Sequence, residues 1–184
     1  ADKTINVLGN FVQSNGSVLL GDTSSKTATL NIDGNMTISG GSGVNFDINS
    51  TSGGTGLINL KGDLSVSTTA QLTATIIGGK VNFVGIGDGS TEALTQTIDI
   101  KNTNSVYYTA FSVNSGFVKL ANQDLYLGTN SSFEVKNGAI FNFGFAADNT
   151  TALNIIRVSS PTLRSGQTFS AISGSTLKLT SPLG

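Results

Sequence analysis

Alternating apolar and polar positions dominate the chain. Short runs with a period of two occur at Met36 to Ser39, Val44 to Ile48, Leu72 to Ile76 and Val81 to Phe83. This period places successive side chains on opposite faces of a β-strand. Further runs lie at Leu64 to Val66, Ile98 to Ile100, Phe111 to Val113, Phe117 to Leu120, Leu125 to Leu127, Phe133 to Val135, Ile140 to Phe143 and Leu177 to Leu179. Because helical periodicity is missing throughout, the sequence predicts an all-β fold.

Turn signals separate these runs. They include Asn15-Gly16, Gly40-Gly41, Gly53-Gly54, Gly78-Gly79 and Asn137-Gly138, dipeptides that favour tight turns. In the clearest parts of the chain, a new strand begins roughly every seven to nine residues. The predicted strands are therefore short, and each ends promptly.

A seven-residue motif repeats in the amino-terminal half. Ile5 to Phe11, Leu30 to Met36 and Ile58 to Leu64 all read apolar, Asn, apolar, any residue, Gly, Asn or Asp, apolar, with glycines 25 and 28 residues apart. Short strands and turns also suit an antiparallel sandwich, but a sandwich does not require a repeat. In a solenoid, equivalent positions stack about 4.8 Å apart. The repeat favours a parallel β-solenoid with about three short strands per coil of roughly 22–28 residues.

Stacking of the motif predicts columns of like residues. Ile5, Leu30 and Ile58 would form one interior apolar column, and Val7, Ile32 and Leu60 a second, which Val81 and Phe83 could extend. An asparagine column would lie on the opposite face and consist of Asn6, Asn31, Asn59 and Asn82. The repeat turns would consist of Gly9, Asn10, Gly34, Asn35, Gly62 and Asp63. We expect the three glycines to adopt positive φ, and Asp33 to pair with Lys61 on the surface.

The repeat becomes less regular after residue 84. We expect one solenoid domain over 1–184, with regular coils over 1–84 and irregular coils over 85–184. Polar, Gly-rich segments at 49–56 and 85–95 are predicted to project as loops. A second signature, Phe-x-(Val or Ala)-x-x-Gly, begins at Phe111, Phe133 and Phe169. The chain closes on a strand without a covering helix, so we expect a segment of a longer secreted protein, or a subunit that stacks on another.

Composition narrows the classes of function. Ten Lys or Arg balance eleven Asp or Glu, and charged residues make up only 11% of the chain, which argues against nucleic-acid binding. The absence of Cys and His excludes disulfides, zinc–thiolate sites and serine–histidine triads. We therefore expect no cofactor and no metal. No apolar run reaches the ~20 residues of a membrane helix, and the Ser, Thr, Asn and Gly content is typical of extracellular β-proteins.

Four stretches resemble a known group of proteins. Leu30 to Gly41, Lys80 to Gly85 and Ser132 to Phe143 are similar to repetitive surface proteins of Bacteroidetes, as is the closing stretch Gly174 to Pro182. The resemblance implies a large secreted protein, commonly exported by the type IX system, that acts as an adhesin or filament. It implies no catalytic residue.

Two kinds of candidate site remain. The asparagine column could bind glycans, or its side chains could hydrogen-bond one another along the stack. Asp88 and Glu92 form the only carboxylate pair close in sequence, as an acid and base of a polysaccharide-degrading enzyme would require. We predict a non-enzymatic structural or adhesive module at the bacterial surface, with self-association or surface glycans as partners. A glycan-binding or polysaccharide-degrading domain is the alternative.

Overall fold

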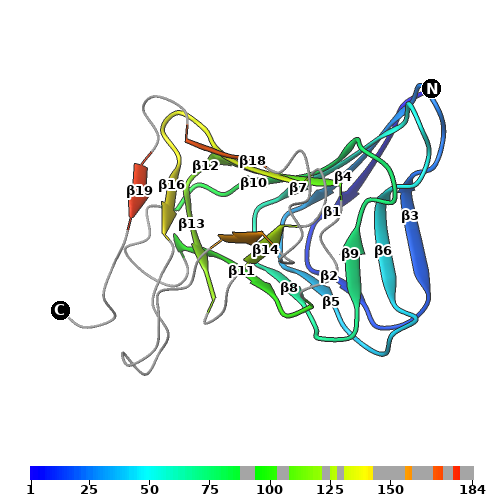
Figure 1. The fold of residues 1–184 in the computed structure, drawn as a ribbon, viewed down its shortest axis with the longest axis horizontal. Coiled ribbons are helices and arrows are strands. Elements are labelled where there is room, and N and C mark those ends of the chain that lie inside the picture. The colour runs from blue at the N-terminus through cyan, green and yellow to red at the C-terminus, as the bar shows by residue number, and fades with distance from the viewer. Residues whose placement is uncertain are drawn as a thin grey trace.

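The chain folds as a parallel β-solenoid of about five turns, with about 26 residues per turn. The structure is a computed structural model that describes residues 1–87, 94–102, 108–121, 125–127 and 131–142, together with the strand backbones 156–158, 168–171 and 176–178. Figure 1 shows the strands stacked side by side between the amino-terminal and carboxyl-terminal ends of the molecule. The predicted all-β solenoid with three strands per coil is confirmed.

Sheet A extends along the solenoid, and its strands come from successive coils. Its seven parallel strands are, in spatial order, β1 (Lys3–Val7), β4 (Thr27–Ile32), β7 (Thr55–Leu60), β10 (Gly79–Val84), β12 (Thr109–Ser115), β15 (Ser132–Val135) and β18 (Thr168–Ala171). Sheet B also has seven parallel strands: β2 (Phe11–Gln13), β5 (Met36–Ile38), β8 (Leu64–Val66), β11 (Gln96–Ile100), β13 (Phe117–Leu120), β16 (Ile140–Asn142) and β19 (Thr176–Lys178).

Two smaller sheets complete the coils. Sheet C contains β3 (Ser17–Gly21), β6 (Asn45–Asn49) and β9 (Gln71–Thr73), and sheet D contains β14 (Leu125–Leu127) and β17 (Ile156–Val158). Within the described residues, sheet C accompanies the first three coils. Most of these strands match the alternating runs or the repeat motif of the sequence to within a few residues. Neither β3 nor β17 has a counterpart among the predicted runs.

The register of sheet A places the motif in vertical columns. Leu30 pairs with Ile5 on one side and with Ile58 on the other, and Ile58 pairs in turn with Val81. The next column holds Val7, Ile32, Leu60 and Phe83 in the same way. Leu30, Ile32, Ile58, Leu60, Val81 and Phe83 are all buried. Both columns follow the order that the repeat predicts. The predicted interior position of Ile5 is wrong, because Ile5 lies on the edge strand β1 and is 56% exposed.

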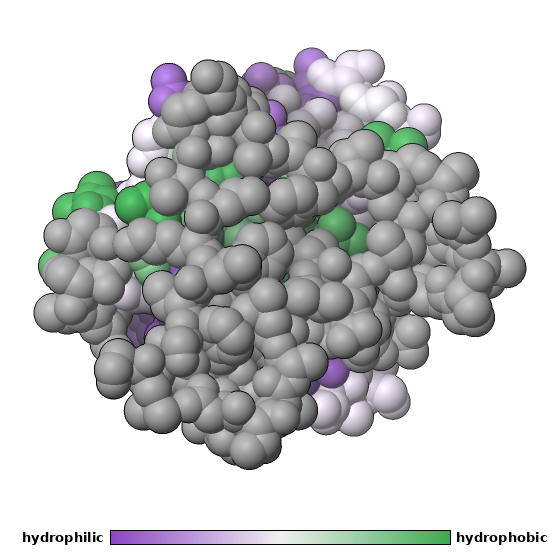
Figure 2. All heavy atoms as spheres, turned by 60° about the vertical axis from the view of Figure 1, so that its left-hand side comes forward, coloured by the Kyte–Doolittle hydropathy of each residue, from purple (hydrophilic) through white to green (hydrophobic). Residues whose placement is uncertain are grey.

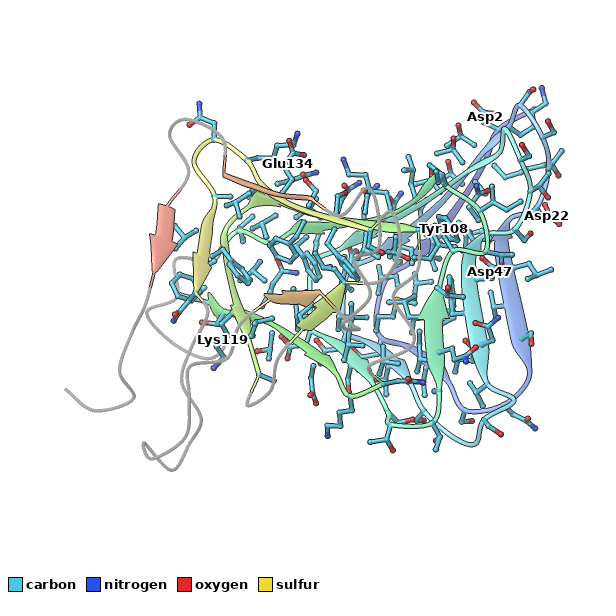
Figure 3. All side chains as sticks on the ribbon, viewed as in Figure 1. Asp2, Asp22, Asp47, Tyr108, Lys119 and Glu134 are labelled. Carbon is cyan, nitrogen blue, oxygen red and sulfur yellow. The ribbon has the colours of Figure 1, made fainter. Side chains whose placement is uncertain are left out.

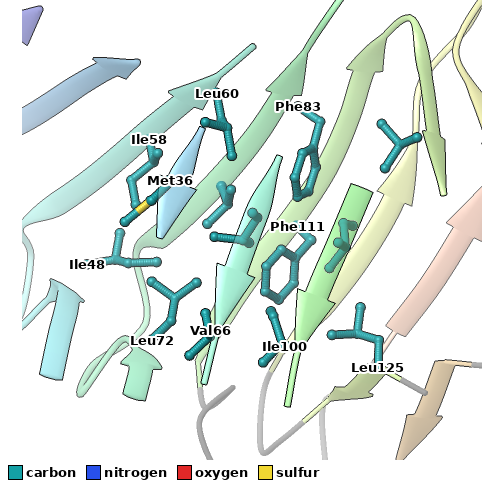
Figure 4. Packing of buried hydrophobic residues seen from close by; sticks show 14 of the residues in the cluster. Met36, Ile48, Ile58, Leu60, Val66, Leu72, Phe83, Ile100, Phe111 and Leu125 are labelled. Carbon is teal, nitrogen blue, oxygen red and sulfur yellow. The ribbon is translucent and has the colours of Figure 1, made fainter. Parts of the chain in front are cut away.

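Sheets A, B and C enclose one continuous apolar core. Figure 4 shows Leu60, Val66, Leu72 and Phe111 projecting into the space between the sheets. The later coils fill this space with aromatic rings: Phe83 stacks on Phe111 with centroids 6.4 Å apart, and Phe111 on Phe133 at 6.3 Å. Burying one such side chain stabilises the fold by roughly 1.5–3 kcal/mol. Phe111 and Phe133 continue the first interior column, because Phe111 pairs with Val81 and Phe133 pairs with Phe111, and both rings are buried. The backbone of Phe169 pairs with Phe133 in the same register.

Two details of the coils differ from the prediction. The segment 49–56 does not project as a loop: Asn49 ends β6, β7 begins at Thr55, and Asn49 and Gly54 are buried. The reason is that Asn49 turns inward at the corner between sheets C and A, where it donates Nδ2 to the Ile77 carbonyl at 2.9 Å. Coil length also exceeds the predicted 28 residues at several places: Leu64 pairs with Ile98, 34 positions further on, and Ser132 with Thr168, 36 positions further on. Gly85 and Ser115 meet on neighbouring coils although they lie 30 positions apart.

Candidate functional site

The four repeat asparagines form one hydrogen-bonded column on the outer face of sheet A. Asn31 donates Nδ2 to Asn6 Oδ1 at 2.8 Å, Asn59 donates to Asn31 at 2.8 Å, and Asn82 donates to Asn59 at 2.8 Å. We call this column the asparagine ladder. Parallel strands in register hold equivalent side chains one strand spacing apart, about 4.8 Å, which is the distance over which amides can bond one another. Exposure falls along the ladder, from exposed Asn6 to Asn82, which is 9% exposed.

The ladder ends at Asn82. The next residue in register is Ser112, whose hydroxyl contacts Asn114 Oδ1 at 2.6 Å instead. Asn82 Oδ1 is consequently a buried acceptor without a partner within the part of the chain that the structure describes. A repeat of four asparagines therefore gives three inter-coil links.

The second half of the motif builds the corner between sheets A and B. Asn10 Oδ1 accepts from the Asn35 backbone N–H at 2.9 Å, Asn35 Oδ1 accepts from the Asp63 N–H at 2.8 Å, and Asp63 Oδ1 accepts from the Thr97 N–H at 2.7 Å. The repeat requires Asn or Asp here because both side chains provide an oxygen acceptor. Each corner side chain thus caps a backbone donor of the following coil.

The corner glycines correct one expectation. Gly9, Gly34 and Gly62 do not adopt positive φ, whereas turn glycines such as Gly16 (φ 66°) and Gly40 (φ 113°) do. At Gly34 a Cβ atom would lie 2.8 Å from the Gly9 carbonyl carbon and would also overlap Asn10 Oδ1. A Cβ at Gly62 would overlap Gly34 and Asn35 in the same way, while one at Gly9 would meet nothing. Gly34 and Gly62 are therefore required by close stacking of the coils.

Gln96 connects neighbouring coils at the place where the repeat motif is interrupted. Its Nε2 donates to the Leu60 and Gly62 carbonyls at 2.9 Å each, and its Oε1 accepts from the Gly85 N–H at 2.8 Å. The side chain is only 5% exposed. A single buried amide thus links the third coil to the fourth across the insertion that follows Gly85. Sequence reasoning missed this residue because Gln96 has no equivalent in the motif.

The carboxylates do not gather into a site within the described residues. Asp47 is buried in sheet C, where Oδ1 accepts from the backbone N–H groups of Asn49 and Thr75, and Oδ2 accepts from the Thr75 hydroxyl. Figure 3 places Asp47 and Asp22 near β3, far from Glu134 and Lys119 in the opposite half. No group of three or more Asp, Glu, His or Cys lies close enough to hold a metal ion in the described ranges. Asp88 and Glu92 lie outside them.

Three ion pairs lie on the surface of the described residues. Lys61 Nζ lies 2.7 Å from Asp33 Oδ1, as the repeat predicts, with side-chain exposures of 58% and 42%. Lys101 lies 3.4 Å from Asp99, and Lys136 lies 2.6 Å from Glu134. In the view of Figure 2, the strongly hydrophilic described residues appear as separate small groups among pale ones. Such a surface offers short-range hydrogen bonding more than a strong field.

Two grooves lie beside these features. One, of about 490 Å³, follows the asparagine ladder and is lined by Asn6, Val7, Leu8, Asn31, Ile32, Asp33, Asn59, Lys61 and Val84. We call it the ladder groove. The other, of about 340 Å³, lies at the corner next to the described ends of the 85–95 segment and is lined in part by Lys61, Asp63, Ile86 and Gln96. Their volumes fall within the range of small-ligand sites.

Comparison with known proteins gives no family for this chain. No protein-family model matches the sequence, and no curated protein or solved structure matches it. The fold of the chain is established as a parallel β-solenoid, without a family. Among the described residues, no helix is long and apolar enough to cross a membrane.

Proposed function

We propose that this chain is a non-enzymatic structural or adhesive module of a bacterial cell-surface or extracellular filament protein. One observation carries the proposal: the polar residues of the repeat link one coil to the next. Asn31 bonds Asn6 and Asn59. Asn35 donates its backbone N–H to Asn10 Oδ1, and its own Oδ1 accepts from the Asp63 N–H. Residues that serve coil-to-coil bonding support a continuous rod, in which each coil stabilises the next.

The resemblance to repetitive surface proteins of Bacteroidetes supports the same proposal. It adds an extracellular location, export by a type IX route, and self-association or surface glycans as partners. The low charge content and the exposed Ser, Thr and Asn side chains suit repeated weak contacts. Nucleic acid is not a proposed partner.

Electron microscopy tests the structural part of the proposal. Negative-stain images of the product of the full open reading frame are expected to show rods or filaments, because every coil added to a solenoid lengthens its sheets along one axis. Compact globular particles would overturn the rod. Depletion assays on a panel of neutral and acidic polysaccharides test the non-enzymatic part, and unchanged substrate is the expected result. If turnover is found, the double variant Asp88→Asn, Glu92→Gln identifies the responsible pair by loss of that turnover.

A further inference from the structure

The ladder groove spans four neighbouring strands of sheet A. Asn6, Asn31 and Asn59 come from β1, β4 and β7, and Val84 ends β10. The groove therefore extends across successive coils, along the axis in which the strands stack. A ligand that fills it must be elongated in the same direction.

The amides in the groove retain hydrogen-bonding capacity. A primary amide has two N–H donors and an oxygen with two lone pairs. Asn31 uses one donor toward Asn6 and one acceptor position toward Asn59, so one of each remains outside the ladder. Asn31 and Asn59 are partly exposed. Because the ladder already fixes these side chains, little rotamer freedom is lost when a ligand binds.

The surroundings of the amides restrict the ligand class. Asp33 and Lys61 neutralise each other at 2.7 Å, so the groove does not select for charge. Leu8, 86% exposed, and Val84 add apolar surface. The groove lies on a sheet face, where backbone groups of β4 and β7 are paired with neighbouring strands, so an extended peptide cannot add to it as a further strand.

The geometry points to a binding site for an extended, uncharged polysaccharide in the ladder groove. Sugar hydroxyls would bond the free N–H and lone pair of Asn6, Asn31 and Asn59, which repeat about every 4.8 Å. The apolar C–H faces of the sugar rings would pack on Leu8 and Val84. A linear polymer suits the site because both partners repeat along one axis.

Affinity electrophoresis of the full chain tests this site. The gels contain hydroxyethylcellulose, galactomannan or, as the acidic comparison, alginate. At least one neutral polymer is expected to retard the protein, and alginate is not. Leu8→Glu should weaken retardation at least about tenfold, because it places a charge against the sugar face. The matched control is Val12→Glu, on the outer face of β2 and also exposed, which should bind as the unaltered chain does.

Three results would overturn the inference: no retardation by either neutral polymer, retardation by alginate alone, or equal loss in Leu8→Glu and Val12→Glu. Both residues are exposed, so both variants are expected to keep the circular dichroism spectrum of a β-protein. This inference rests on the proposed adhesive function and names its ligand class. If the protein forms rods but binds no neutral polymer, the ligand class is wrong and the structural role stands. If it forms globular particles that bind a neutral polymer, the rod is wrong and the ligand class stands.

Discussion

Gly34 donates its backbone N–H to the Gly9 carbonyl at 3.0 Å, so the two glycines stack directly at the corner between sheets A and B. Gly62 repeats the contact on Gly34 at 3.1 Å. The corner is consequently a column of backbones in contact, with no room for a side chain between successive coils.

This column predicts that two substitutions at the same repeat position differ in their effect on stability. Gly34→Ala should lower the free energy of unfolding by about 1–3 kcal/mol, the usual cost of overpacking, because the new Cβ meets the Gly9 backbone. Gly9→Ala should change it by no more than about 0.5 kcal/mol, since nothing lies near its Cβ. Urea denaturation followed by circular dichroism measures both. Equal losses would show that backbone conformation, and not stacking, requires glycine here.

The asparagine ladder should contribute measurably to stability. Asn31→Ala removes two inter-coil hydrogen bonds, each of which typically contributes about 0.5–1.5 kcal/mol. We expect a loss of about 1–3 kcal/mol in the same denaturation experiment. Ser65→Ala, on the outer face of sheet B, is the control and should stay within about 0.5 kcal/mol. A ladder variant as stable as the control would mean that water replaces the ladder bonds at no cost.

Gln96 is expected to be the most sensitive polar residue of the fourth coil. Gln96→Leu leaves the Leu60 and Gly62 carbonyls and the Gly85 N–H without their partner. A buried polar group left unsatisfied costs about 1–3 kcal/mol, so we expect a loss of more than about 2 kcal/mol. Gln71→Leu provides a partly exposed comparison in β9. Thermal unfolding of the two variants, measured side by side, tests this prediction. Equal midpoint temperatures would contradict it.

The Asp47 corner makes a similar prediction in sheet C. Thr75→Val removes the hydroxyl that donates to the buried Asp47 carboxylate while keeping the side-chain shape. Hydrogen bonds to charged groups contribute about 1.5–3 kcal/mol, so stability should fall by that amount. Thr73→Val, which replaces the residue paired with Asp47 on the neighbouring strand, should have a much smaller effect. Comparable losses in both variants would assign the effect to the segment 73–75 as a whole.

The exposed pair of Asp33 and Lys61 should matter little. Lys61→Ala removes a contact between side chains that are 42% and 58% exposed, and such pairs contribute about 0–1 kcal/mol. The difference from the unaltered chain should shrink further as salt screens the charges. A loss that persists in concentrated sodium chloride would indicate a packing role for the Lys61 side chain.

The repeat was sufficient to predict the interior columns and the order of the asparagines. Parallel coils in register stack like residues on like, so the spacing of Ile5, Leu30 and Ile58 fixes their neighbours without knowledge of the turns. The Asp33–Lys61 pair followed from the same rule. Periodicity therefore carries most of the information about sheet A.

The sequence alone does not show why particular residues are required at single positions. Glycine satisfies both positive φ and close approach by lacking a Cβ, so the motif alone does not distinguish the two at Gly34. Asn49 stands before a Ser, Thr and Gly-rich stretch that is typical of an exposed loop, yet it bonds a carbonyl of the next coil. Gln96 depends on where the chain returns after an insertion. In each case the decisive partner lies on another coil.

Every link of the asparagine ladder also has the same sense, because each residue donates toward the amino terminus and accepts from the coil that follows. The side-chain amide dipoles are therefore aligned head to tail along the stack. Asn6 Nδ2 forms the donor end and Asn82 Oδ1 the acceptor end of this array. Although the net charge of the chain is only −1, the outer face of sheet A is electrically asymmetric. A polymer with two unlike ends would consequently lie on it in one preferred orientation.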